Sequence, residues 1–104
     1  MSSGLVMKEK EMDGFVLVSI SGEVDIYTCQ DLKDKLYQLV DLYGKDLILD
    51  CEGLNYIDST GLGVFVAVLK KVKQNQIQIT IENLKESIKK LFVITSLDSL
   101  FNIK

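Results

Sequence analysis

The sequence predicts an α/β fold in which helices pack on a mixed β-sheet. Segments with strand-like patterns alternate along the chain with segments of helical periodicity, and two β-prone segments joined by a tight turn open it. The expected order is β-β-α-β-α-β-α, followed by short C-terminal elements. With 104 residues and 47% hydrophobic composition, the chain is expected to form one domain over residues 1–104.

The first two strands are expected over residues 5–12 and 15–21. They are separated by Asp13-Gly14, a dipeptide that accommodates the positive φ of a tight hairpin turn. The chain should therefore begin with an antiparallel hairpin.

The first helix is expected from Thr28 to Tyr43. Apolar residues recur there at helical spacing, Thr28 and Asp31 resemble a capping box, and Gly44 follows as a stop signal.

Two further strands and a helix are expected in the second half of the chain. Residues 46–51 form a short apolar run typical of an interior strand, and isoleucines alternate with polar residues over 77–82. Asn83 is then expected to cap a helix that carries Ile88, Leu91 and Phe92. Residues 95–104 are compatible with a last helical turn and a short strand.

The composition excludes several classes of chemistry. All twelve cations are Lys and no His is present, so a His-based triad, a His-ligated metal or a His general base is impossible. The net charge of −3 comes from interleaved charges without a basic patch, which argues against a nucleic-acid partner. We expect no cofactor.

The thiols and the apolar runs indicate a cytoplasmic protein. Cys29 and Cys51 lie far apart without neighbouring metal ligands, and buried free thiols are favoured over a disulfide. The N-terminus lacks a signal-peptide pattern and no apolar run is long enough to cross a bilayer, so no membrane association is expected.

The hexad Asp58-Ser59-Thr60-Gly61-Leu62-Gly63 joins a buried-looking strand to an apolar helix. It presents the Ser59 hydroxyl at a helix start, where unpaired N–H groups suit an anion. In a purely structural interpretation, Asp58 or Ser59 is an N-cap and the glycines allow a tight entry. The hexad matches neither the dinucleotide-binding nor the P-loop pattern, and Ser59 has no neighbouring base to make it a nucleophile.

The helix after the hexad has apolar residues on more than one side. At about 100° per residue, one arc faces the core and contains six of them: Leu62, Phe65, Val66, Val68, Leu69 and Val72. Val64 and Ala67 fall on the opposite side, in line with Thr60. We therefore expect both to be exposed and to form a protein-binding face with Thr60 and Gly63, although scattered surface aliphatics are an ordinary alternative.

A second acidic segment, Gly22-Glu23-Val24-Asp25, precedes the first helix. The exits of the second and third strands can lie side by side, which would bring Asp25 and Tyr27 towards Asp58 and Ser59. Asp25 is then either a solvated loop carboxylate or a neighbour of the partner-binding site.

Three separated motifs carry a family resemblance: residues 22–27, residues 56–66, and Glu82-Asn83-Leu84 with residues 91–95. Together they resemble the STAS-domain anti-sigma-factor antagonists of bacterial stress pathways, over nearly the whole chain. The resemblance implies a STAS-type fold and a regulatory protein rather than an enzyme. Asp25, Asp58, Thr60, Gly61 and Gly63 match the motif positions around the phosphorylated serine.

The resemblance implies partner switching controlled by Ser59. The unphosphorylated form would bind an anti-sigma factor and free the sigma factor, thereby regulating transcription. That anti-sigma factor, itself a serine kinase, would phosphorylate Ser59 and so block binding, and a metal-dependent serine phosphatase would restore the unphosphorylated form. Two alternatives stay open: a STAS module that serves as a scaffold or ligand sensor without switching, and a receiver domain phosphorylated on Asp50.

Overall fold

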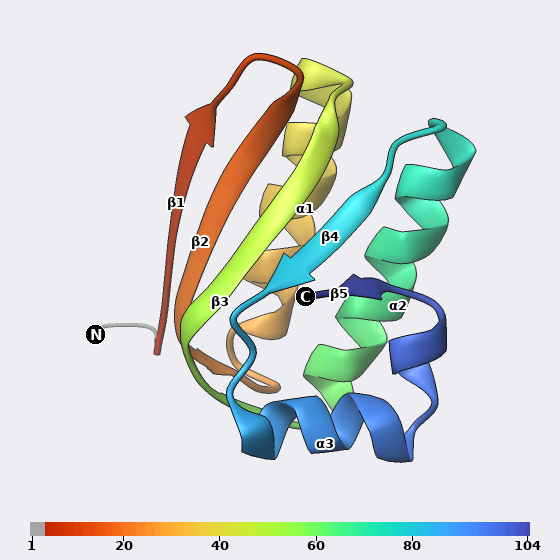
Figure 1. Ribbon diagram of the computed structural model, residues 1–104. Coiled ribbons are helices and arrows are strands. Elements are labelled where there is room, and N and C mark those ends of the chain that lie inside the picture. The colour runs from red at the N-terminus through yellow and green to blue at the C-terminus, as the bar shows by residue number, and fades with distance from the viewer. Residues whose placement is uncertain (1–3) are drawn as a thin grey trace.

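The computed structural model describes residues 4–104, which form a five-stranded mixed sheet and three α-helices (Figure 1). The elements are β1 (Leu5–Glu11), β2 (Phe15–Val24), α1 (Cys29–Tyr43), β3 (Asp46–Ile57), α2 (Ser59–Gln74), β4 (Ile79–Glu82), α3 (Glu86–Ile94), the 3-10 helix η1 (Leu97–Ser99) and β5 (Asn102–Ile103). The strand order is β1-β2-β3-β4-β5, in which β1 is antiparallel to β2 and all other pairs are parallel. The predicted fold class and element order are confirmed.

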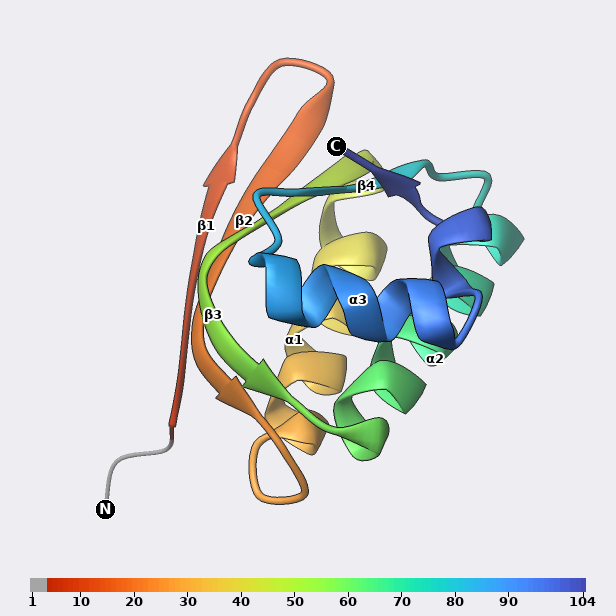
Figure 2. The ribbon, with the colours of Figure 1, turned by 60° about the horizontal axis from the view of Figure 1, so that its bottom comes forward.

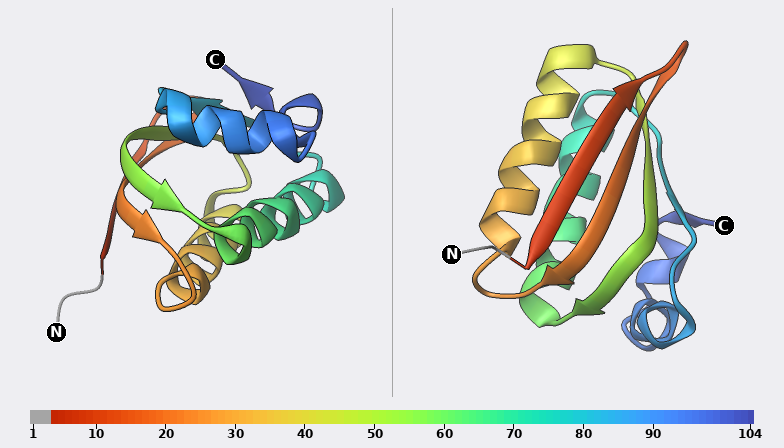
Figure 3. Two further views of the ribbon diagram at one scale, coloured as in Figure 1. Left: turned by 90° about the horizontal axis from the view of Figure 1, so that it is seen from below. Right: turned by 90° about the vertical axis from the view of Figure 1, so that its left-hand side faces the viewer.

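Helices α1 and α2 lie side by side on one face of the sheet (Figure 3). Alternate residues of the central strands face them: Val16, Val18 and Ile20 of β2 are almost completely buried, whereas the residues between them are only half-buried. This period-two pattern places the main core between the sheet and the helix pair. Among the described residues, the outer face of β1 and β2 carries no helix, as Figure 3 shows.

Helix α3 crosses the end of the sheet close to the first half of α2 (Figure 2). Three buried phenylalanines join these elements edge to face, since the Phe65 ring lies 5.6 Å from Phe92 and 6.2 Å from Phe101. Phe92 and Phe101 are 6.0 Å apart. Each such pair adds about 0.5–1.5 kcal/mol beyond area burial, so the cluster fixes the half of α2 that carries the hexad.

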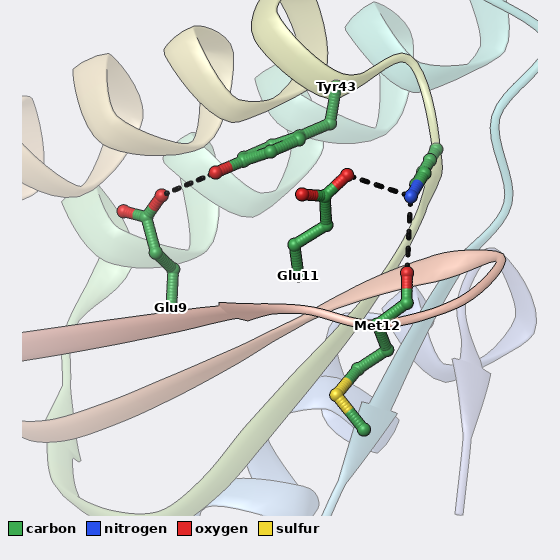
Figure 4. Close-up of polar contacts among 5 residues, drawn as sticks. Glu9, Glu11, Met12 and Tyr43 are labelled. Atoms are coloured by element: carbon green, nitrogen blue, oxygen red, sulfur yellow. Dashed lines mark hydrogen bonds and ion pairs between the residues drawn. The ribbon is translucent and has the colours of Figure 1, made fainter.

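The predicted N-terminal hairpin is confirmed, and polar side chains connect it to the helix layer. Gly14 has a φ of 96° in the turn, as expected. Polar contacts connect the hairpin to the end of α1 (Figure 4): the Tyr43 hydroxyl donates to Glu9 at 3.5 Å, and Lys45 Nζ lies 2.8 Å from Glu11 Oε2. Lys45 also donates to the Met12 carbonyl at 3.2 Å.

Two predicted helix caps are wrong. Helix α1 begins after Thr28, but the Thr28 side chain does not cap it, because its hydroxyl is bonded to the chain that precedes the helix. Helix α3 begins at Glu86, so Asn83 lies too early to be its cap. Asn83 instead has a φ of 63° and donates through Nδ2 to Asp50 at 3.0 Å, which links the end of β4 to β3.

The C-terminal segment contains the short helical turn and the short strand that its spacing predicts. β5 pairs in parallel with β4 and becomes the edge of the sheet. Within residues 4–104, none of the helices is long and apolar enough to cross a membrane.

Candidate functional site

The ends of β2 and β3 bring two acidic loops together. The strands are parallel and Val24 lies opposite Ile57, so Asp25 and Asp58 follow neighbouring strand ends (Figure 2). The Asp58 N–H donates to the Val24 carbonyl at 3.2 Å, which extends the pairing into the loops. The predicted proximity of the Asp25 segment to the hexad is therefore confirmed.

Asp58 is the N-cap of α2. Its Oδ1 atom accepts hydrogen bonds from the N–H groups of Thr60 at 3.0 Å and Gly61 at 3.2 Å, and from the Thr60 hydroxyl. The Thr60 hydroxyl, followed by the backbone N–H groups of Gly61 and Thr60, lowers the pKa of the Asp58 carboxyl below its usual value. Two of the N–H groups that an anion could use at this helix start, those of Thr60 and Gly61, are thus already bonded to Asp58.

Ser59 is the first residue of α2, and its side chain is exposed. Among the described residues, no hydrogen-bond partner lies within reach of its hydroxyl, whereas the neighbouring Thr60 hydroxyl is engaged by Asp58. The two adjacent hydroxyls are consequently not equivalent. Ser59 offers an accessible acceptor for a transferred group, and Thr60 maintains the cap.

The two glycines of the first turns differ in their surroundings. A Cβ atom on Gly61 would lie 2.5 Å from Ile57 Cγ1 and 2.7 Å from Val24 Cγ1, so only glycine lets the helix start pack on the two strand ends. A Cβ atom on Gly63 would meet no atom within 4 Å. Close packing inside this chain therefore explains Gly61, while Gly63 leaves open surface.

The expectation that Val64 is exposed is wrong, because its side chain is only 7% accessible. The buried arc of α2 is rotated towards Val64, and in exchange Leu62 and Val66 are only half-buried. The cause is α1, which packs along this flank: the Tyr37 hydroxyl donates to the Ala67 carbonyl at 3.3 Å. The helical wheel placed the sheet on one side of α2 and did not include a second helix beside it.

The exposed face of α2 therefore runs from Ser59 and Thr60 through Gly63 to the half-buried Ala67. It continues into a shallow hollow of about 450 Å³ between α1 and α2. Lys71 closes one side of this hollow, where it forms an ion pair with Asp41 at 2.8 Å. Ala67 borders the hollow, so part of the predicted face is accessible without Val64.

Exposed apolar side chains lie near the two joined strand ends, in the loop after β2 and towards the end of β3. Tyr27 is 89% exposed and Ile26 is 68% exposed in the loop after β2, and Tyr56 near the end of β3 is 49% exposed. Sequence reasoning selected Tyr27 but missed Ile26 and Tyr56. The available signal for Ile26 was an apolar pair inside a polar strand-to-helix turn, a position where a buried role is hard to satisfy.

The hydrogen bonds of Asp50 indicate a structural role for its side chain. It lies inside β3, seven positions before the strand ends at Ile57, and its Oδ1 atom accepts from Asn83 Nδ2 and from the Glu52 N–H at 3.1 Å. A receiver domain would require an exposed phosphoacceptor carboxylate at a strand end. Asp50 does not meet that requirement, because it lies inside the strand and its side chain is hydrogen-bonded. Across residues 4–104, no group of three or more Cys, Asp or Glu side chains is arranged to hold a metal ion.

The two cysteines are free thiols. Cys51 is buried in β3, and burial, together with the neighbouring Asp50 charge, raises the pKa of its thiol to about 12. Cys29 is partly accessible at the start of α1.

Comparisons with known proteins agree with this fold. Residues 7–104 match the family described as STAS domain. The chain is 39% identical over 103 residues to the anti-sigma-B factor antagonist of Bacillus subtilis strain 168, covering 99% of this chain and 92% of that protein.

Solved structures share the fold at lower sequence identity. An anti-sigma factor antagonist from Mycobacterium paratuberculosis superposes with a TM-score of 0.85 at 22% identity, over 95% of this chain and 84% of that one. The Bacillus cell fate determinant SpoIIAA in its phosphorylated form has a TM-score of 0.72 at 17% identity, over 95% of this chain and 91% of its own. By its match to the family and to a relative of nearly the same length, the chain belongs to the STAS-domain family, among the anti-sigma factor antagonists.

Proposed function

We propose that this chain is an anti-sigma factor antagonist that switches partners through Ser59. In its unphosphorylated form it binds a cognate anti-sigma factor, which releases the sigma factor, and phosphorylation of Ser59 blocks that binding. The observation that carries the proposal is the exposed, unengaged Ser59 hydroxyl at the start of α2, beside the exposed apolar loop of Ile26 and Tyr27. The relative named as an anti-sigma-B factor antagonist supports the partner class.

The local charge explains how one phosphate can act as a lock. Phosphorylation adds about −1.5 to −2 charge at pH 7 beside Asp58, with Asp25 on the neighbouring strand end. The hexad offers no compensation, because Asp58 already uses the helix N–H groups, and the sequence has no Lys from 46 to 69 and no Arg. A dianion without a partner is costly to bury in an interface, so binding can be lost without refolding.

The proposed interface consists of the Ser59 helix start and the loop beside it. Asp25, Tyr27, Asp58, Thr60, Gly63 and Ala67 are the residues that we assign to partner contact. Gly61 contributes from below the surface, because its missing Cβ lets the helix start reach the strand ends. A contact with Val64 is not part of the proposal, since that side chain is buried.

The proposed partners supply the chemistry. The anti-sigma factor is a serine kinase that brings ATP and metal, and a metal-dependent serine phosphatase regenerates the binding form. This chain is the substrate in both reactions and needs no cofactor of its own. Its place of action is the cytoplasm, where sigma factors meet RNA polymerase.

The proposal is tested by incubating the full chain with candidate anti-sigma kinases from its own organism and ATP, followed by intact mass and phosphosite mapping. One phosphate on Ser59 is expected, with none on Ser59→Ala. Ser87→Ala, at an exposed serine of α3 outside the proposed interface, serves as the matched control and should still be phosphorylated on Ser59. If the anti-sigma factor binds the fully phosphorylated protein as tightly as the unphosphorylated protein, the switch is overturned and a scaffold role is favoured.

A further inference from the structure

Thr28 is the one polar residue among residues 4–104 that is almost completely buried, with 2% of its surface accessible. Its hydroxyl donates to the Glu23 carbonyl at 2.8 Å and accepts from the Asp25 N–H at 3.0 Å. The side chain does not cap α1. Both bonds instead connect the start of α1 back to the end of β2, which closes the loop between them.

Asp25 completes the closure of this loop. Its Oδ1 atom accepts from the N–H groups of Tyr27 at 2.9 Å and Thr28 at 3.2 Å, and its carbonyl accepts from the Cys29 N–H at 2.8 Å. Polar groups at both ends of the loop are therefore bonded internally. The side chains left outside are those of Ile26 and Tyr27, both largely exposed.

The same arrangement occurs at the neighbouring strand end. Asp58 Oδ1 also accepts from the N–H groups two and three residues ahead and from a threonine hydroxyl. The hydrogen bond from the Asp58 N–H to the Val24 carbonyl joins the two loops. Tyr27 is thus held in a defined position relative to Ser59 rather than on an independent loop.

We infer that Thr28 is a positioning residue of the partner-binding site, which holds Ile26 and Tyr27 as a preformed apolar anchor beside Ser59. The inference rests on the proposed function and deepens it, because it assigns the anti-sigma kinase a complementary apolar pocket next to its catalytic site. Exposed aromatic anchors dominate many interfaces, and a fixed loop avoids the entropy of ordering on binding. Thr28 itself is buried and acts only through the loop.

The test compares Thr28→Val, which keeps the shape and removes every hydrogen bond of the hydroxyl, including the one it makes to Asp25 Oδ1 at 3.3 Å, with Thr28→Ser, which keeps the hydroxyl. Steady-state kinetics of Ser59 phosphorylation by the anti-sigma kinase separate the effects. Thr28→Val should raise KM about tenfold, the equivalent of one lost order of magnitude in affinity, and leave kcat within about twofold. Thr28→Ser should restore a KM close to that of the wild type.

A double-mutant cycle distinguishes positioning from general destabilisation. In an Ile26→Ala, Tyr27→Ala background, Thr28→Val should raise KM by less than about twofold, because the anchor is already absent. A full, additive effect would overturn the inference. Hydrogen exchange gives a second readout: Thr28→Val should speed exchange of the Asp25 and Tyr27 amides without changing those in the core of α2.

The outcomes separate the two proposals. If the wild type is not phosphorylated on Ser59 by any anti-sigma kinase, the proposed function fails. If it is phosphorylated but the KM for Thr28→Val equals that of the wild type, only the positioning role fails. Should Thr28→Val not fold, the surface variant with Ile26→Ala and Tyr27→Ala decides, since an unchanged KM there would exclude the anchor.

Discussion

Replacing each of the two glycines of α2 by alanine should change stability in opposite directions. Both residues lie in regular helix, where alanine is favoured over glycine by up to about 1 kcal/mol. At Gly63 the new Cβ enters open space, so Gly63→Ala should stabilise the fold by about 0.5–1 kcal/mol.

At Gly61 the new Cβ meets two side chains that cannot easily move. It would lie 2.5 Å from Ile57 and 2.7 Å from Val24, whose side chains are 3% and 0% exposed. Overpacking of this kind costs about 1–3 kcal/mol, which exceeds the helix-propensity gain. Gly61→Ala should therefore destabilise by about 1–2 kcal/mol, and for a chain of this size each kcal/mol corresponds to about 4–8 °C in Tm.

Urea and thermal unfolding followed by circular dichroism measure the pair under one set of conditions. A Gly61→Ala protein as stable as the wild type would refute the packing of the helix start on the strand ends. The same two proteins also test the docking face. Gly63→Ala should fold better and yet bind the anti-sigma factor more weakly, because its methyl group stands on the proposed contact surface.

Three further predictions follow from burial and charge. Val64→Glu should lower the free energy of unfolding, measured in urea, by about 3 kcal/mol or more, because it places an unpaired carboxylate in the core. A change of less than about 1 kcal/mol would contradict the burial of Val64. With the thiol pKa of Cys51 raised to about 12, native protein at pH 8 should react with Ellman's reagent first at Cys29 and only slowly at Cys51; equal rates would contradict its burial. Asp58→Ala should lower Tm at pH 7. Because the folded pKa of Asp58 is lowered, this difference should shrink as pH falls from about 4, and a difference that persists in acid would show that the carboxylate charge is unimportant.

Local signals predicted most of the fold. The Asp13-Gly14 turn, the apolar spacing before Gly44 and the alternating isoleucines each depend on near neighbours in sequence, and all three elements are confirmed. The start of α2 at the hexad could also be predicted, because a capping residue followed by an apolar helical pattern marks where a helix begins.

The errors arose where the decisive contact comes from a distant element. The burial of Val64 depends on α1, which the helical wheel of α2 does not contain. Thr28 and Asn83 both have side chains suited to helix caps, but each bonds to a neighbouring strand end or strand instead. The space left for Gly61 is likewise set by Val24 and Ile57 from two different strands.

The central claim is that the charge on Ser59 alone controls partner binding. Its most direct test is calorimetric titration of one anti-sigma factor with the unphosphorylated protein and with the same protein phosphorylated on Ser59. A switch between nearly full and nearly no binding requires about a 10⁴-fold change in Kd, so phosphorylation is expected to weaken binding by about that factor with no change in the circular dichroism spectrum. Equal affinities for the two forms would contradict the account.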